Sequence, residues 1–183
     1  MINLSSGTIL IADPFLKDPN FRRSVVFLCE HQQEGSFGFI MNRLYHQPVS
    51  NLIDDLAGCG FPVYYGGPVQ LDTVHFLHQC PQIIQGGTEI TDGIFWGGDF
   101  EQIVELIQNK IILPSMLRFY IGYSGWTEGQ LAGEVKEKSW LTTKGCKKLV
   151  FHGDTHKVWP DAIRELGSDY EQLINYPLDP QLN

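Results

Sequence analysis

The sequence is most constrained by two β-rich segments that a short polar stretch separates. Residues 24–31 read SVVFLCEH, and residues 36–41 read SFGFIM. Both runs are rich in β-branched, aromatic and other apolar residues, a composition typical of strands. The four residues between them, Gln32–Gly35, have the length and composition of a turn. The two segments therefore predict a β-hairpin over residues 24–41.

Further apolar runs predict more strands, and amphipathic spacing predicts a smaller number of helices. The expected strands cover 8–12, 62–65, 75–80, 83–84, 94–96, 117–123, 139–142 and 148–151. The expected helices cover 49–56, 100–109 and 156–166, and a fourth runs from Thr127 to about Glu137. Asp99 is the expected N-cap of the second helix, and Pro160 is expected in the first turn of the last.

Strands outnumber helices in this pattern, and no regular βαβ alternation is present. The predicted fold class is therefore α+β, with a mixed, largely antiparallel sheet and flanking helices. A length of 183 residues suits one domain with a core of its own. We expect a single domain over residues 1–183 with an irregular C-terminal tail at about 168–183.

Charge and cysteine usage narrow the partners and the compartment. The chain carries 13 Lys and Arg against 21 Asp and Glu, a formal net charge of −8. This sign argues against nucleic acid and anionic membranes as partners. The four cysteines form no C-x-x-C pair, which favours reduced thiols over a disulfide framework. Without a secretory signal or an apolar run of ~18–20 residues, the sequence predicts a cytoplasmic protein.

Three of the four basic residues in the first hundred are arginines that flank the predicted hairpin. Arg22 and Arg23 precede its first strand, and Asn42 and Arg43 follow its second. Because these two ends lie side by side in a hairpin, the residues are expected to gather there, where arginine forks suit a carboxylate or phosphate. The alternative is that they form surface ion pairs with Asp13, Asp18 or Asp54.

A second candidate anion site is the Gly-Trp-x-x-Gly-Gln stretch, Gly125–Gln130. Residues 124–126 are expected to form a turn between a strand and a helix. Such a junction exposes backbone N–H groups and the positive end of a helix dipole, and Trp126 would pack over the ligand. The alternative interpretation makes Trp126 a core anchor and gives the glycines a role in the turn alone.

Nucleophilic catalysis has one candidate pair, Cys29 and His31. On a regular strand these residues share a face, although their separation of ~7 Å exceeds hydrogen-bond reach. The alternative is that Cys29 is a buried structural thiol. No nucleophile elbow or phosphate-binding loop matches in full. Histidine and cysteine groups at 75–80 and 146–156 are loose enough to arise by chance, so neither a metal nor a cofactor is expected.

Four segments carry a resemblance to a known family: GTILIADPFLKDPNFRRSVVFLCEH, EGSFGFIMNR, YYGGPVQLD and RFYIGYSGWTEGQLAGEV. With these segments in this order, the chain resembles the YqgE/AlgH family of bacterial proteins. The resemblance implies a cytoplasmic, single-domain α+β protein with a mixed, partly barrel-like sheet. It implies no known chemistry, although some members carry the name of transcriptional regulator. One departure is Leu44, where the family has proline.

The residue patterns and the resemblance single out the same places, the ends of the hairpin and the Gly125–Gln130 stretch. We expect a non-enzymatic binding or regulatory protein that recognises a small anion or an acidic group of a protein partner. The alternatives are an enzyme of unknown reaction that uses His31 or Cys29, and direct binding to DNA. The candidate ligand-binding residues are Arg23, Ser24, His31, Asn42, Arg43, Arg118, Gly125, Trp126, Gly129 and Gln130.

Overall fold

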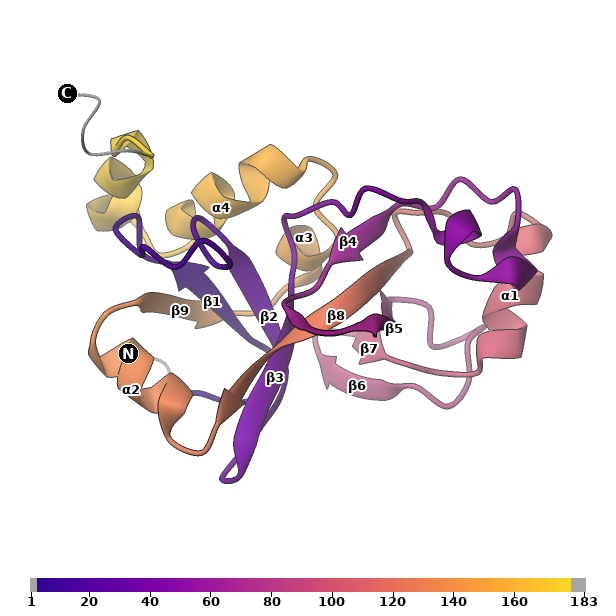
Figure 1. The fold of residues 1–183 in the computed structure, drawn as a ribbon, viewed down its shortest axis with the longest axis horizontal. Helices are drawn as coiled ribbons and strands as arrows, with labels where there is room; N and C mark the ends of the chain where they lie inside the picture. The colour runs from indigo at the N-terminus through magenta and orange to yellow at the C-terminus, as the bar shows by residue number, and fades with distance from the viewer. Residues whose placement is uncertain (1–2, 179–183) are drawn as a thin grey trace.

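The computed structural model describes residues 3–178, and nine strands in this range form one connected sheet (Figure 1). The strands are β1 (Thr8–Ala12), β2 (Val25–Gln32), β3 (Gly35–Ile40), β4 (Val63–Tyr65), β5 (Val69–His78), β6 (Thr88–Thr91), β7 (Ile94–Trp96), β8 (Leu117–Thr127) and β9 (Trp140–Lys144). Their order is β6-β7-β5-β8-β3-β2-β1-β9, and β4 pairs with β8 beside this path.

The sheet is mixed and largely antiparallel, because β4 with β8 is the parallel pair among the described strands. It curls along its length like an open half-barrel, and helices lie around it (Figure 1). The fold class predicted from the sequence is therefore confirmed.

Four α-helices and three 3₁₀ segments in the described range flank this sheet. They are α1 (Phe100–Gln108), α2 (Gln130–Lys136), α3 (Lys147–Val150), α4 (Thr155–Arg164), η1 (Val49–Asn51), η2 (Asp54–Leu56) and η3 (Ser168–Asn175). Asp99 caps α1 as predicted, because its carboxylate accepts a hydrogen bond from the N–H of Gln102 at 3.2 Å. Within residues 3–178, no helix combines the length and apolar character needed to span a membrane.

The predicted hairpin is present as β2 and β3. Its register pairs Val26 with Ile40 and Gln32 with Gly35, with one β-bulge between Leu28 and Glu30. At a bulge, one strand carries an extra residue opposite the same length of its partner. Cys29 is that residue. From Glu30 onward, each side chain of β2 therefore points to the opposite face from the one it would take in a regular strand.

Strand β8 lies in the middle of the sheet and connects its two halves. Its first half pairs with β5 and β4, and its second half pairs with β3, where Ser36 lies opposite Trp126. The prediction of a turn at residues 124–126 is therefore wrong. Gly125 looks like a turn residue locally, but β3 supplies backbone partners that keep the strand going.

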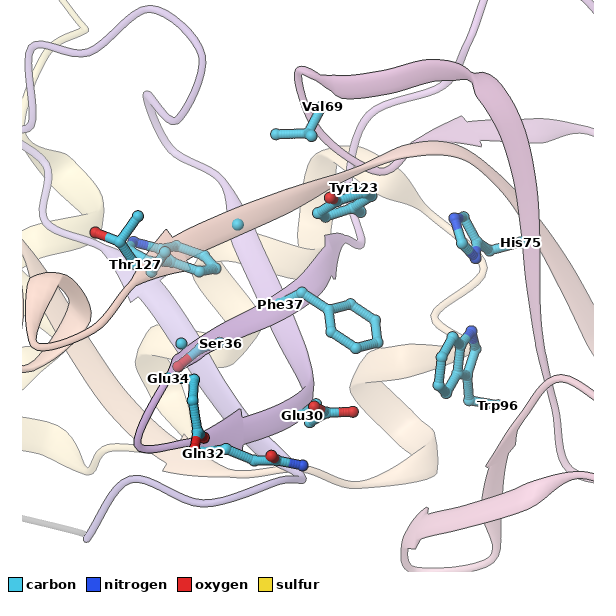
Figure 2. A pocket seen from close by; sticks show the side chains of 13 residues that line it. Glu30, Gln32, Glu34, Ser36, Phe37, Val69, His75, Trp96, Tyr123 and Thr127 are labelled. Atoms are coloured by element: carbon cyan, nitrogen blue, oxygen red, sulfur yellow. The ribbon is translucent and has the colours of Figure 1, made fainter.

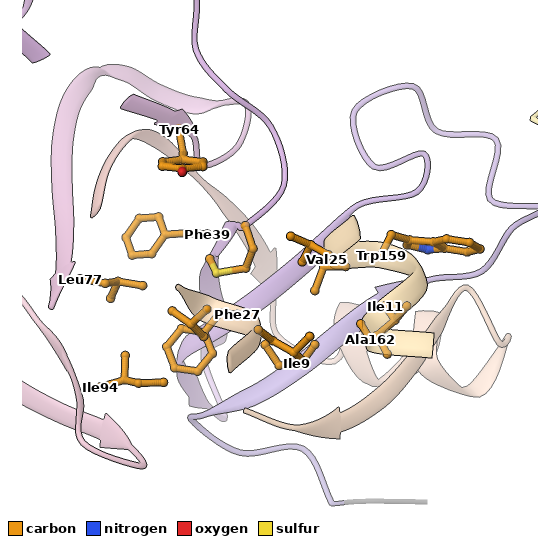
Figure 3. Close-up of a cluster of buried hydrophobic side chains, with 14 of the residues drawn as sticks. Ile9, Ile11, Val25, Phe27, Phe39, Tyr64, Leu77, Ile94, Trp159 and Ala162 are labelled. Carbon is orange, nitrogen blue, oxygen red and sulfur yellow. The ribbon is translucent and has the colours of Figure 1, made fainter. Parts of the chain in front are cut away.

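Three clusters of buried apolar side chains fill the space between the sheet and its helices. The first lies between α4 and the faces of β1, β2 and β3 (Figure 3). The second surrounds α1, and the third packs α2 against the opposite face of β1 and β2. Apolar clusters thus cover both faces of β1 and β2, which explains why all of β1 and most of β2 are buried.

Several local predictions are wrong for identifiable reasons. Residues 49–56 form two 3₁₀ segments instead of one helix, because Ile53 between them is extended. Residues 83–84 form a turn whose N–H groups both donate to the carbonyl of Cys80. Residues 148–151 contribute to helix α3, since a short buried apolar run fits either state. Strand β6 is polar enough that no pattern indicated it.

The C-terminal region also differs in part from the prediction. Helix α4 begins at Thr155, so Pro160 lies in its second turn and not its first. The apolar side of the helix is as expected, with Val158, Trp159, Ala162 and Ile163 buried in the first cluster. Residues 168–175 of the expected irregular tail form η3, and residues 179–183 lie outside the described range.

Gly38 in the hairpin leaves no room for a side chain. A Cβ at this position would lie 2.2 Å from the carbonyl oxygen of Phe27 on the neighbouring strand. We expect Gly38→Ala to lower the free energy of unfolding by about 1–3 kcal/mol or more, because the backbone would have to move. Urea unfolding followed by circular dichroism measures this loss.

Gly133→Ala is the matched control in helix α2. A Cβ there meets no atom within 4 Å, and the residue is helical. This substitution should raise stability by about 0.5–1 kcal/mol, because alanine loses less backbone freedom on folding. Equal effects of the two substitutions would contradict the strand pairing at Gly38.

Candidate functional site

The open end of the hairpin gathers the polar residues predicted to meet there. The Asn42 amide donates to the carbonyl of Arg23 at 2.9 Å, and its oxygen accepts from the N–H of Val25 at 3.0 Å. The side chain thereby imitates a strand neighbour at the point where β3 has ended. Ser24 is fully buried, and its hydroxyl donates to the carbonyl of Phe21 at 2.8 Å. Both side chains close the loop that precedes β2.

The two hairpin arginines are also occupied by the protein itself. Arg43 donates to the carbonyls of Arg22 at 3.1 Å and Pro19 at 3.3 Å. Arg23 donates to the carbonyl of Tyr176, and its guanidinium lies 4.4 Å from the ring centroid of Trp159 on α4. These contacts attach the 13–24 loop and the C-terminal region to the sheet.

Arg118 lies elsewhere, on the first half of β8. It is 4% exposed, donates to the carbonyl of His152 and sits 4.6 Å from the ring centroid of Tyr64. Its Nε and Nη1 atoms are buried without a hydrogen-bond partner in the described structure. No ion pair within 4.0 Å involves the hairpin arginines Arg22, Arg23 and Arg43 in residues 3–178, so the surface ion-pair alternative does not describe them either.

The Gly125–Gln130 stretch lies at the opposite end of the hairpin from the arginines. Gly125 and Trp126 belong to β8, and Gly129 caps the seven-residue helix α2 without a side-chain hydrogen bond. Thr127 and Gln130, three residues apart, form half of a capping box, because the Gln130 oxygen accepts from the N–H of Thr127 at 3.0 Å. The junction is therefore a strand continued into a short helix, not an open cradle of N–H groups.

Trp126 is a core anchor, and Glu134 on α2 explains the surrounding motif. The indole N–H groups of Trp126 and Trp140 donate to the Glu134 carboxylate at 2.9 and 2.8 Å. Gln130 donates to the other oxygen at 2.9 Å. With Trp126 only 5% exposed, this carboxylate joins α2 to β8 and β9. The alternative interpretation of Trp126 is the one the structure supports.

Cys29 and His31 do not form a catalytic pair. The bulge after Leu28 places Cys29 in the first core cluster, while His31 lies opposite Ser36 on the other face of the hairpin. Burial raises the pKa of the Cys29 thiol well above its ordinary value. The His31 Nδ1 atom is 2.6 Å from the Ser36 hydroxyl. The prediction that the two residues share a face is wrong, because it assumed a regular strand.

The two histidine and cysteine groups are each held by internal hydrogen bonds. His152 Nε2 lies 2.9 Å from the Asp161 carboxylate. His78 is fully buried, with Nε2 3.1 Å from the carbonyl of Gly97 and Nδ1 accepting from the N–H of Cys80. Within residues 3–178, no three His, Cys, Asp or Glu side chains converge as metal ligands would.

A cleft of about 630 Å³ lies at the turn end of the hairpin, between it and strands β5, β7 and β8 (Figure 2). We call it the aromatic cleft, because five ring-bearing residues line it: Trp126, and the four whose rings contact one another, Phe37, His75, Trp96 and Tyr123. Its rim includes Glu30, Gln32 and Glu34 of the hairpin, with Val69 and Thr127 on the other side. The volume lies within the ~300–1,000 Å³ typical of small-molecule sites.

The four rings follow one another in a closed circuit. The centroid of Phe37 lies 5.0 Å from Trp96 and 5.9 Å from Tyr123. The centroid of His75 lies 6.3 Å from Trp96 and 6.2 Å from Tyr123. Three of these contacts are edge-to-face and the His75–Trp96 contact is tilted, so each ring helps to fix the orientation of its neighbour. All four side chains remain half-buried, so each keeps part of its surface open to the cleft.

The electrostatics of the aromatic cleft are opposite to those expected for an anion site. Glu30 and Glu34 are the charged residues that line it, and neither has an ion-pair partner in the described range. Burial lowers the pKa of His75 below its ordinary value, which favours the uncharged ring. Its Nε2 atom is buried without a hydrogen-bond partner in residues 3–178.

The structure divides the ten predicted site residues into three groups. Arg23, Ser24, Asn42 and Arg43 meet at the open end, Arg118 lies apart, and the others surround the turn end. Gly125 and Trp126 border the aromatic cleft, although its other four rings were not singled out. Phe37 and Trp96 stand on predicted strands, but no local pattern indicates that their rings meet in the structure.

Comparisons with known proteins cover nearly the whole chain. A family model described as AlgH-like matches residues 9–171. A UPF0301 protein of Chlorobaculum tepidum is 41% identical over 180 residues, which span 98% of this chain and 96% of the relative. A UPF0301 protein of Cytophaga hutchinsonii is 38% identical over 181 residues, which span 98% of this chain and 100% of the relative.

Two solved structures share the fold. The solution structure of the AlgH protein of Pseudomonas aeruginosa has a TM-score of 0.74 and 25% identity, over 97% of this chain and 98% of that one. A crystal structure of a protein from Corynebacterium diphtheriae has a TM-score of 0.79 and 20% identity, over 96% of this chain and 94% of that one. The latter likeness concerns the fold alone.

We expect Glu134→Ala to lower the free energy of unfolding by about 2–4 kcal/mol, because two largely buried indole N–H groups would lose their acceptor. Glu134→Gln keeps one acceptor oxygen and should lose less. Thermal and urea unfolding measure both. The exposed Glu137→Ala on the same helix is the control, and a loss equal to that of Glu134→Ala would contradict the role of Glu134.

Cysteine reactivity separates the buried-thiol interpretation from the catalytic one. We expect a maleimide added to the native protein at pH 7.5 to modify half-buried Cys59 much faster than fully buried Cys29. Mass spectrometry of digested protein locates the label. If Cys29 reacts as fast as Cys59, the buried-thiol interpretation is wrong and the enzyme hypothesis regains its nucleophile.

Proposed function

The chain belongs to the AlgH-like family, and from this premise we propose that it is a non-enzymatic binding protein whose ligand enters the aromatic cleft. The observation that carries the proposal is the cleft itself. It is the place where rings from four strands and unpaired carboxylates face a common space. Aromatic side chains with a few convergent polar groups are the usual lining of a ligand site.

The absence of a nucleophile with a base supports binding over catalysis in the described residues. Cys29 and His31 are on opposite faces, and the His31–Ser36 contact faces away from Phe37. A general base must lie within hydrogen-bond reach of its proton in the site. In the aromatic cleft, His75 touches rings and has no hydroxyl or thiol partner in this range.

The contacts of the two hairpin arginines favour a structural role over anion binding. The guanidinium groups of Arg23 and Arg43 are directed to backbone carbonyls, which hold loops in place. The proposal therefore moves recognition from the open end of the hairpin to its turn end. The formal net charge of −8 also supports a partner other than nucleic acid.

A fragment screen by protein-observed NMR tests the proposal. The fragments should include neutral, cationic and anionic compounds in equal numbers. We expect the hits to shift backbone amides of residues 35–37, 96 and 123–127, which border the aromatic cleft. Hits that instead cluster around Arg23, Arg43 or Arg118 would restore the anion hypothesis, and an absence of hits at the cleft would contradict the proposal.

Trp96→Ala with a matched variant shows whether the cleft itself binds the hits. Trp96 lines the aromatic cleft, whereas Tyr170 lines a separate groove beside α2 and β9. We expect Trp96→Ala to weaken the hits by about 10-fold or more, because aromatic contacts contribute strongly to binding sites. Tyr170→Ala should leave them unchanged. Equal weakening by both variants would indicate a general loss of stability.

A further inference from the structure

The geometry of the aromatic cleft points to a class of ligand: it binds an organic cation, through an alkylated ammonium group that lies in the cleft against the wall formed by Trp96, Phe37 and Tyr123 and beside the carboxylate of Glu30. This inference rests on the function proposed above and specifies its chemistry. The argument has four steps, which concern the rings, the charges, the histidine and the size of the site.

The rings supply the electrostatic preference. The face of an aromatic ring carries negative charge density and attracts a cation that lies within about 6 Å of the centroid. Phe37 lies between the other two rings, with its centroid 5.0 Å from that of Trp96 and 5.9 Å from that of Tyr123. A group placed against one ring is therefore close to the next. Alkylated ammonium groups fit this arrangement best, because they are large, weakly hydrated and lose little on leaving water.

The charges of the lining have one sign. Glu30 lies opposite Phe37 in the hairpin register, so both side chains point to the cleft face. Glu34 follows at the turn, and no lysine or arginine lines the cleft. Because neither carboxylate has an ion-pair partner in residues 3–178, both are available to a ligand. A cation would gain from both, whereas an anion would be repelled.

His75 completes the wall without opposing a cation. Its ring lies between Trp96 and Tyr123 in the circuit and also packs against Phe39 at 5.2 Å. Its Nε2 atom is buried and has no partner within the described residues. Burial lowers the pKa of His75 and so favours the uncharged ring, which adds no positive charge to the wall. A lysine or arginine at position 75 would repel a cation. The presence of histidine there is therefore consistent with the negative charge of Glu30 and Glu34.

The volume of the cleft indicates a ligand larger than an ammonium group alone. A space of about 630 Å³ exceeds what a single ammonium group fills. The remaining volume extends toward Val69 and Thr127, where the lining is apolar and neutral (Figure 2). A ligand with an ammonium head at the rings and a neutral tail toward β8 matches this division.

Choline and 3,3-dimethylbutan-1-ol test the inference, because they have the same shape and differ in charge. Isothermal titration at low salt measures their affinities, and NMR reports the shift of the Trp96 indole N–H. We expect choline to bind about 5- to 30-fold more tightly than the neutral alcohol, the range of one or two cation–π contacts. Its affinity should fall as salt is added.

The outcomes separate the inference from the function on which it rests. If the alcohol binds at the cleft as well as choline, the binding function stands and the preference for a cation is wrong. If 3,3-dimethylbutanoate binds more tightly than choline, the preference is also wrong. If none of the three probes shifts cleft resonances, both fall. A peptide that carries trimethyl-lysine, compared with choline, shows whether the ammonium group comes from a protein or a free metabolite.

Two substitutions and one control assign the effect to residues. Trp96→Leu keeps apolar bulk but removes the ring face, and should weaken choline about 5- to 30-fold while leaving the alcohol nearly unchanged. Glu30→Gln keeps the shape and should weaken choline about 2- to 5-fold, with a smaller salt dependence. Glu101→Gln on α1 is exposed outside the cleft and should change neither. Unchanged choline affinity in both cleft variants would overturn the inference.

Discussion

The structure depends on one strand having different partners along its length. Strand β8 pairs with β5 and β4 over its first half and with β3 over its second. The hairpin side of the sheet and the β5–β7 side are thereby connected through the backbone of a single segment. Hydrogen bonds along β8 hold the two sides at a fixed angle, and the aromatic cleft lies in the corner that they form.

Glycines make this shared strand possible. At Gly66 and Gly67, a Cβ would lie 2.3 Å from backbone atoms of β8, so β4 and the turn after it can approach only without side chains. Gly122 has a φ of +64° inside β8, at the point where the strand passes from one set of partners to the other. A positive φ favours glycine, because other residues meet a steric penalty there. The glycines of the YYGGPVQ and IGYSGW segments therefore allow the same close approach between β8 and the turn that follows β4.

Predictions from sequence succeeded where the determining contacts are local. The β2–β3 hairpin and the cap at Asp99 depend on residues within a few positions of one another. The turn expected at Gly125 failed because β3, far away in sequence, supplies its hydrogen-bond partners. The arginines were placed correctly at the hairpin end, yet their acceptors are carbonyls of loops whose paths no local pattern describes. The aromatic cleft was missed for the same reason, since its rings come from four separate strands.

The bulge at Cys29 has a consequence for comparing this chain with its relatives. If the strand lacked position 29, the residues on either side would still alternate between the two faces of the hairpin. Each would point to the same face as now, both before the bulge (Phe27, Leu28) and after it (Glu30, His31). A one-residue gap in an alignment is therefore tolerable at this position. The same gap elsewhere in the strand would exchange the core and cleft faces of every following residue. Position 29 is thus where this strand could lose a residue and still present Glu30 to Phe37.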